Sequence, residues 1–183
     1  MRCHRGVQMH KLVQQLAKYA AYHRDPRNVA THFVGIPMIV LAVTVLLSRP
    51  SFELGWLPVS PALVAVLVFA VYYLRLDIGF GLVMSALLAA CLLAGNWVSQ
   101  YSTAIWLAVG VGAFVLGWVI QFIGHYFEGQ KPAFIDDIMG LATGPLFVVA
   151  EFGFLFGIRA EVQYEIEQLV GPLRSHGDSP QES

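Results

Sequence analysis

Charged residues are scarce in this chain. Lys, Arg, Asp and Glu together make up 13% of its 183 residues, whereas hydrophobic residues make up 57%. Soluble domains carry about 25% charged residues, and a soluble protein of this size has too little interior to hide so much apolar surface. Helices satisfy their own backbone polar groups in lipid. The composition therefore predicts an all-α integral membrane protein in which the lipid bilayer covers part of the surface.

The chain also has few cysteines and no excess of basic residues. The two cysteines, Cys3 and Cys91, lie far apart, so neither a disulfide framework nor a thiolate metal site is indicated. The formal net charge of −1 gives no basic surface for nucleic acid. Residues 1–28 lack the continuous apolar run of a cleaved signal peptide. The search for a function therefore turns to the hydrophobic helices and the histidines.

An N-terminal amphipathic helix is predicted over residues 7–23. Apolar positions recur there near helical spacing, and Lys11 and Lys18 lie on the polar side, as is typical of helices in the membrane interface. Asp25 and Pro26 then suit the N-cap and first position of a new helix. At about 1.5 Å per residue, a helix over residues 26–47 can cross a hydrocarbon core of roughly 30 Å.

Further apolar segments predict a bundle of four to five hydrophobic helices. Residues 1–158 are expected to form a single membrane-embedded catalytic domain, and residues 159–183 a polar, partly disordered tail. Pattern alone leaves open whether the last segment crosses, kinks at Gly144-Pro145 or re-enters. Glycines 110, 112 and 117 are expected to allow close helix packing. After 26–47, the segments are residues 62–75, 80–95, 104–125 and 138–158, separated by a turn-rich loop at 48–61, a polar link at 96–103 and a polar insert at 126–137.

The distribution of basic residues predicts the orientation. Six Lys and Arg residues precede the first long segment, whereas the link near Ser99 has none and the loop near Leu54 has only Arg49. The positive-inside rule then places the N-terminus in the cytoplasm. The membrane would be a bacterial inner membrane, or the endoplasmic reticulum of a eukaryote. An even number of crossings before residue 125 returns His125 to the side that holds His23 and His32.

Three of the six histidines form a pattern. His23 ends the predicted surface helix, and His32 lies roughly 9 Å into the first long segment. His125 precedes Gly129, an expected helix stop, and so lies roughly 6 Å inside the other end. Imidazole binds iron, zinc and copper alike. Ionisable groups in membrane segments are costly and usually functional, but the spacing alone leaves open a metal site or separate hydrogen-bonded histidines.

Polar residues accompany these histidines. Glu128 shares a helix face with His125, so it is a candidate metal ligand or catalytic group. Other carboxylate and amide side chains nearby can accept the second N–H of a ligating histidine. Asp25 can equally be a helix cap, Glu128 a solvated helix end, and the arginines anchors to lipid headgroups. The candidates that orient the ligands are Asp25, Asn28 and Asp136.

A family resemblance is carried by five strings: residues 22–28 (YHRDPRN), 31–37 (THFVGIP), 124–129 (GHYFEG), 131–133 (KPA) and 144–147 (GPLF). With these strings the chain resembles the membrane-embedded, iron-dependent 2-hydroxy fatty acid dioxygenases, whose fungal members act in α-oxidation during phytosphingosine breakdown. The resemblance covers residues 12–158 in order. It implies an Fe(II) centre held by His23, His32 and His125, and the oxidative loss of one carbon from a 2-hydroxy fatty acid.

A mechanism consistent with this resemblance needs open iron positions for O₂ and for a chelating 2-hydroxy acid. Three histidines, or two with Glu128, would complete the protein's share of the ligands. Arg24, Arg27 or Lys131 would pair with the substrate carboxylate. The sequence leaves the oligomeric state and the preferred chain length open.

Two other functions fit the same residues. A zinc-dependent membrane hydrolase would use the histidines and Glu128 to activate water. A non-enzymatic transport or assembly protein would be expected to carry ionisable residues deep in its spans. Only Glu151 lies well inside an apolar segment, and no inverted repeat is evident, which argues against transport.

Overall fold

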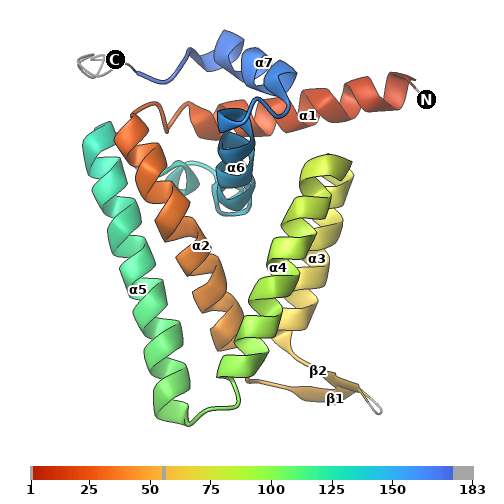
Figure 1. Cartoon of the computed structure of the whole chain (residues 1–183), viewed down its shortest axis with the longest axis vertical. Helices are drawn as coiled ribbons and strands as arrows, with labels where there is room; N and C mark the ends of the chain where they lie inside the picture. Colours follow the sequence, from red (N-terminus) through yellow and green to blue (C-terminus); the bar gives the residue numbers. More distant parts are fainter. Residues whose placement is uncertain (1, 55–56, 175–183) are drawn as a thin grey trace. The chain divides into compact units, whose positions relative to one another are not determined.

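The structure, a computed structural model, describes residues 2–54 and 57–174 and is built from helices, as the composition predicts. The chain divides into two compact units, one of residues Met1–Val34 with Ile120–Ser183 and one of Gly35–Val119. Each unit is described separately below (Figure 1). The helices are α1 (Arg2–Ala20), α2 (Pro26–Ser48), α3 (Pro61–Leu76), α4 (Ile78–Val98), α5 (Thr103–Glu128), η1 (Ala133–Ile135), α6 (Gly140–Leu155) and α7 (Ala160–Val170).

In the unit of residues 35–119, α3 and α4 form an antiparallel hairpin (Figure 1). Asp77 separates the two helices, and its carboxylate caps α4 by accepting the Phe80 N–H at 2.9 Å. The helices approach so closely that a β-carbon on Gly81 would lie 2.6 Å from the Cα atom of Leu74. A side chain larger than hydrogen at this position would therefore separate the hairpin.

Two of the three glycines expected to allow close packing do so. A β-carbon on Gly110 would meet the side chain of Leu46, and one on Gly117 would lie 3.0 Å from the Gly35 carbonyl oxygen. The prediction is wrong for Gly112, which has nothing within 4 Å. The helical period explains the difference, since Gly110 and Gly117 are two turns apart on one face of α5 and Gly112 lies off that face.

The segment predicted as a turn-rich loop, residues 48–61, contains a short hairpin of two strands. The strands are β1 (Phe52–Leu54) and β2 (Leu57–Val59), paired antiparallel with Phe52 opposite Val59. Residues 55–56 lie outside the described part of the chain. Runs this short carry too few alternating residues to be recognised as strands from sequence.

Three helices, α2, α4 and α5, are long and apolar enough to cross a membrane within the described residues. The α6–α7 pair, bent by 114°, would count as a fourth if it forms one span. At 16 residues α3 is shorter than these. With α3 and α6 included, the described residues form five apolar helices, which agrees with the predicted four to five. The orientation in the membrane stays a prediction.

The unit that contains the histidines is built around α1. Helix α1 contacts both α6 and α7, which lie on opposite sides of it (Figure 1). It ends at Ala20, earlier than predicted, because the chain closes a tight turn in which the His23 N–H donates to the Ala20 carbonyl at 3.0 Å. The packing between these helices consists of fully buried apolar side chains, among them Leu12, Leu16, Leu146, Phe147 and Val162.

The last apolar segment forms α6, which contains Pro145 without ending there. The bend follows Leu155, where Gly157 has a φ of +68° and Arg159 a φ of 59°. Residues 160–170, predicted only as part of a polar tail, form α7 and bury Val162 and Ile166. The expected disorder beyond residue 174 lies outside the described residues.

Candidate metal centre

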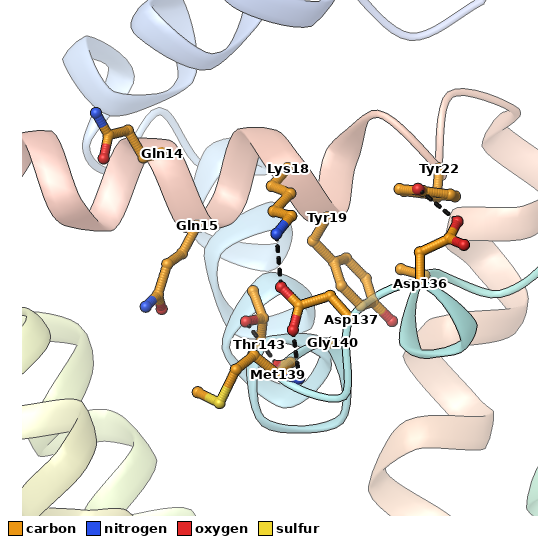
Figure 2. Close-up of a pocket in the computed structure, with 11 residues that line it drawn as sticks. Gln14, Gln15, Lys18, Tyr19, Tyr22, Asp136, Asp137, Met139, Gly140 and Thr143 are labelled. Carbon is orange, nitrogen blue, oxygen red and sulfur yellow. Dashed lines mark hydrogen bonds and ion pairs between the residues drawn. The ribbon is translucent and has the colours of Figure 1, made fainter.

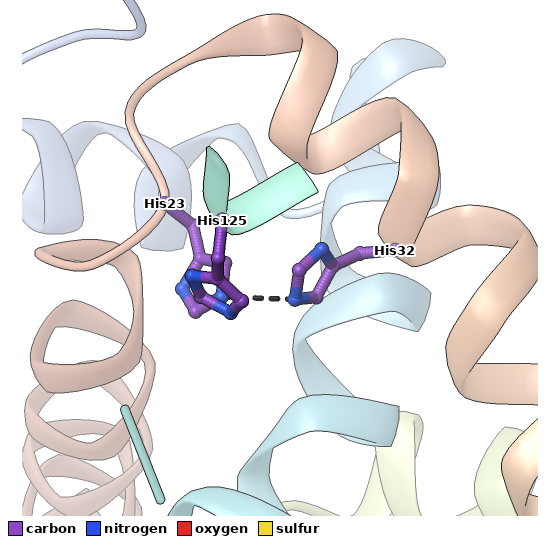
Figure 3. A group of neighbouring side chains, drawn as sticks. All are labelled: His23, His32 and His125. Atoms are coloured by element: carbon purple, nitrogen blue, oxygen red, sulfur yellow. Dashed lines mark hydrogen bonds between the residues drawn. The ribbon is translucent and has the colours of Figure 1, made fainter. Parts of the chain in front are cut away.

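The three histidines singled out by the sequence converge on one buried point (Figure 3). His23 lies in the turn between α1 and α2, His32 on the second turn of α2, and His125 on the last turn of α5. One nitrogen from each ring lies within 4.8 Å of the others. The side chains are 0%, 2% and 7% exposed, respectively. Elements far apart in sequence thus bring three imidazoles together.

The outer nitrogens of two rings are held by backbone carbonyls. Nδ1 of His23 lies 2.7 Å from the Tyr19 carbonyl oxygen, and Nδ1 of His32 lies 2.8 Å from the Asn28 carbonyl oxygen. A carbonyl oxygen only accepts, so each Nδ1 must carry the proton and donate it. In a neutral ring the lone pair is then on Nε2. Both carbonyls lie one helical turn before the histidine that they orient.

The two Nε2 atoms face each other at 3.0 Å. With both rings neutral, this contact sets one lone pair against another. A proton between them would create a buried imidazolium, which is costly away from water. Nitrogens bound about 2.1 Å from one metal lie roughly 3.0 to 3.4 Å apart. The spacing of His23 and His32 therefore fits two ligands of a shared metal ion.

The His125 ring also has a buried nitrogen, Nδ1, without a hydrogen-bond partner among the described residues. Buried polar atoms without a partner are rare in native proteins, and an ion at the site is one ordinary reason for them. Three neutral imidazoles form a donor set suited to iron, zinc or copper. The residues present therefore fit a bound metal.

Aromatic rings close the site from the side of α1 and α6. The Tyr19 ring stacks on His23, with ring centres 4.2 Å apart and an angle of 5° between the planes. Phe147, itself 1% exposed, contacts both rings, at 5.0 Å from Tyr19 and 5.6 Å from His23. Burial, together with the neighbouring His32, lowers the pKa of His23 well below its usual value. A neutral imidazole is the form that binds a metal.

Glu128 lies beside the histidines but does not join the group that converges. Its carboxylate accepts the backbone N–H of Arg24 at 3.1 Å and of Asp25 at 2.8 Å. It also accepts the Asn28 amide at 3.0 Å and pairs with Arg174 at 3.1 Å. With four donors on two oxygens, the carboxylate holds the turn that carries His23 against the helix that carries His125.

Asp25 acts as the helix cap that the sequence allowed. Its carboxylate accepts the backbone N–H of Arg27 at 2.8 Å and pairs with the Arg27 guanidinium at 2.7 Å. The hydrogen bond from that guanidinium lowers the pKa of Asp25. The Arg27 guanidinium also lies over the Phe127 ring, 4.7 Å from its centre. These interactions stabilise the start of α2.

The remaining basic candidates already have partners. The Arg24 side chain donates to the carbonyls of Ala20 at 2.8 Å and Gly171 at 2.6 Å, and is therefore engaged with the backbone. Lys131 pairs with Asp136 at 2.6 Å. The three residues expected to bind a substrate carboxylate, including Arg27, thus each have an intramolecular partner in this structure.

A cavity of about 320 Å³ adjoins the site (Figure 2). Tyr19 lines this cavity and also stacks on His23. At the rim, Lys18 pairs with Asp137 at 2.7 Å and Tyr22 donates to Asp136 at 2.8 Å. Asp136, predicted to orient a ligand, therefore belongs to the rim of the cavity. The other lining residues come from α1, η1 and α6, including Gln14, Gln15, Met139, Gly140 and Thr143.

The chain is similar to known proteins. A family model described as 2-hydroxy-palmitic acid dioxygenase Mpo1-like matches residues 9–155. The chain belongs to the Mpo1-like family. It is also 30% identical over 162 residues to the 2-hydroxy-palmitic acid dioxygenase MPO1 of Saccharomyces cerevisiae, covering 85% of this chain and 90% of that protein. No solved structure matches the chain.

The region matched by the Mpo1-like model contains all three histidines and Glu128, and ends at the last residue of α6. Helix α7 and Arg174, which pairs with Glu128, lie beyond it. The carbonyls of Tyr19 and Asn28 were not foreseen as the groups that orient the rings, since a backbone contact leaves no mark on residue type. Their position four residues before each histidine was the available clue.

Proposed function

We propose that this Mpo1-like protein is an Fe(II)-dependent dioxygenase that shortens 2-hydroxy fatty acids by one carbon. The observation that carries the proposal is the pair of inward Nε2 atoms of His23 and His32, 3.0 Å apart and joined by His125 in a buried group. The name of the yeast relative supports the substrate class.

Iron is proposed as the metal, with His23, His32 and His125 as its ligands. Three protein ligands would leave room on the metal for O₂ and the substrate, as non-haem iron oxygenases require. When bound, Fe(II) would supply the redox chemistry that lets O₂ react with an organic acid. The 2-hydroxyl and carboxylate of the substrate, two oxygen groups on neighbouring carbons, would both be available to the metal.

The protein's own groups would have two tasks. The Tyr19 and Asn28 carbonyls fix the tautomer and direction of two ligand rings, which raises ligand basicity and limits their motion. Tyr19 and Phe147 exclude water from one side of His23. Glu128 acts on the backbone around His23, so its proposed role changes from catalytic group to support for the ligands.

The proposed reaction balances with O₂ as the oxidant. One 2-hydroxy fatty acid and one O₂ give the fatty acid one carbon shorter, carbon dioxide and water. The bond between the carboxyl carbon and the hydroxyl-bearing carbon breaks. The substrate loses four electrons, and O₂ takes up all four. No further reductant is needed.

A membrane setting suits this substrate. The histidines lie near the ends of α2 and α5, two helices able to span a bilayer. A fatty acid could therefore present its polar head at the site while its tail stays in lipid. The basic residues around α1 support placing this end of the protein at the cytoplasmic face. Reporter fusions at residue 174 and in the hairpin at residues 55–56 would test that orientation.

The zinc hydrolase is less well supported. Such an enzyme needs a carboxylate free to take a proton from bound water. Glu128, the carboxylate that the sequence offered for this role, is 1% exposed and accepts four donors. The oxygenase requires no such base from the protein.

Product analysis tests the proposal. Purified, Fe(II)-loaded protein is incubated with 2-hydroxyhexadecanoate with and without O₂, and the products are identified by mass spectrometry. We expect pentadecanoate only when O₂ is present. If folded, iron-replete protein forms no shortened acid, this substrate is wrong and the zinc hydrolase becomes the leading candidate.

A further inference from the structure

Helix α5 carries a buried polar side chain to which nothing above assigns a role. Gln121 is 4% exposed, and neither its Nε2 nor its Oε1 has a hydrogen-bond partner within the described part of the chain. The next two residues, Phe122 and Ile123, are 52% and 47% exposed and lie on the outer side of the helix. Gln121 therefore brings a complete, unpaired amide into the interior.

An amide left in this state is unfavourable. A buried donor or acceptor without a partner loses its hydrogen bonds to water and gains nothing in return. In a helix bordered by lipid the loss is not relieved by solvent. Met or Leu would fill the same space without this cost. The presence of Gln121 is therefore better explained by a ligand that pairs with the amide than by the stability of the fold.

The position of Gln121 relates it to the histidines. It precedes His125 by four residues, so both side chains lie on the same face of α5. Side chains on a helix lean toward its N-terminus, so the His125 ring leans over the turn that carries Gln121. Gln121 thus lies on the same face of α5 as His125, one turn nearer the middle of the helix.

We propose that Gln121 binds the head group of the 2-hydroxy acid and selects it over an ordinary fatty acid. Its Oε1 accepts the hydrogen of the 2-hydroxyl, and its Nε2 donates to a carboxylate oxygen. An amide needs a partner that both donates and accepts. An ionised fatty acid without the hydroxyl offers only acceptors and leaves Oε1 unpaired. This inference rests on the proposed function and names the residue that gives it specificity.

The test compares binding of two acids without turnover. Anaerobic, Fe(II)-loaded protein in detergent is titrated calorimetrically with 2-hydroxyhexadecanoate and with hexadecanoate. The variants are Gln121→Met and Gln121→Leu, and melting temperature and iron content are measured for each. The matched control is Gln163→Met on α7, where the amide is paired with Glu167 at 2.9 Å.

We expect wild-type protein and Gln163→Met to prefer the hydroxy acid, and both Gln121 variants to lose about tenfold or more of that preference. Their iron content should be unchanged and their ligand-free melting temperatures no lower than that of the wild type. An undiminished preference in both variants, or a lower melting temperature in both, would overturn the role of Gln121 alone. If the wild type itself shows no preference, the proposed substrate fails with it.

Discussion

The Nε2 atoms of His23 and His32 lie 3.0 Å apart in the interior, and each neutral ring donates its only N–H, on Nδ1, to a backbone carbonyl. A metal ion bound between them would convert this unfavourable contact into two ligand bonds. Ligands that bind only the folded state stabilise it by mass action, by about 2.7 kcal/mol at one hundred times the dissociation constant.

Metal addition should therefore raise the melting temperature. For a protein of this size, that stabilisation corresponds to a shift of about 5 °C or more. Differential scanning fluorimetry of metal-stripped protein, with and without Zn(II) as a redox-inert probe, measures the effect. A melting temperature that does not respond to Zn(II), Fe(II) or Co(II) would argue against a metal at this site.

Removal of His125 should remove the metal. His125→Ala leaves two imidazoles, too few to compete with buffer and chelators, so bound iron should fall at least tenfold by elemental analysis. The control is Tyr126→Ala, whose side chain is the neighbour of His125 on α5 but 83% exposed. Its iron content should match the wild type. Unchanged iron in His125→Ala would exclude His125 as a ligand.

Glu128→Gln separates a structural from a catalytic role. The glutamine amide would keep one acceptor oxygen. Its NH₂ group would face some of the N–H donors that the carboxylate now accepts, so those donors would lose their acceptor. Breaking a buried, charged network of this kind costs about 3–5 kcal/mol, so a clear fall in melting temperature and weaker metal binding are expected. Glu161→Gln is the control, because its pair with Arg159 involves a 55% exposed carboxylate and is worth about 0–1 kcal/mol.

The opposite result for Glu128 would be equally clear. If Glu128→Gln has the melting temperature and the iron content of the wild type but is inactive, the carboxylate is catalytic and the structural assignment is wrong.

Gly124 should be needed for the approach of α5 to the start of α2. A β-carbon at Gly124 would collide with the side chains of Thr31 and Asn28, next to His32. Gly124→Ala should therefore lower both the melting temperature and the affinity for metal. Gly112→Ala on the same helix meets nothing within 4 Å and should be neutral or slightly stabilising, because Ala favours helix. Equal melting temperatures for the two variants would contradict the packing described.

Much of the fold follows from the sequence, because hydrophobic length and helix-start residues are local properties. Asp25 and Pro26 mark the start of α2, and the apolar segments mark the helices. The three histidines were found by the same reasoning, since parity of crossings placed them on one side. Their convergence at one point depends on tertiary contacts, so only the structure shows it.

The contacts that sequence could not predict are tertiary ones. Glu128 was a candidate catalytic group or alternative metal ligand, and in the structure its carboxylate accepts two backbone N–H groups, which sequence does not reveal. Arg24 was a candidate for binding the substrate carboxylate, and in the structure its guanidinium donates to the Gly171 carbonyl, beyond the last apolar helix. Gln121 was visible as a polar residue in an apolar span, but only its burial without partners distinguishes it.

The most direct test of the account is metal reconstitution of one batch of stripped protein. Equal portions are loaded with Fe(II) or Zn(II), or left metal-free, and each is given 2-hydroxyhexadecanoate and O₂. The account predicts pentadecanoate and stoichiometric O₂ uptake from the Fe(II) protein alone. Chain shortening by the metal-free or the Zn(II) protein would contradict the claim that these three histidines hold the iron of an oxygenase.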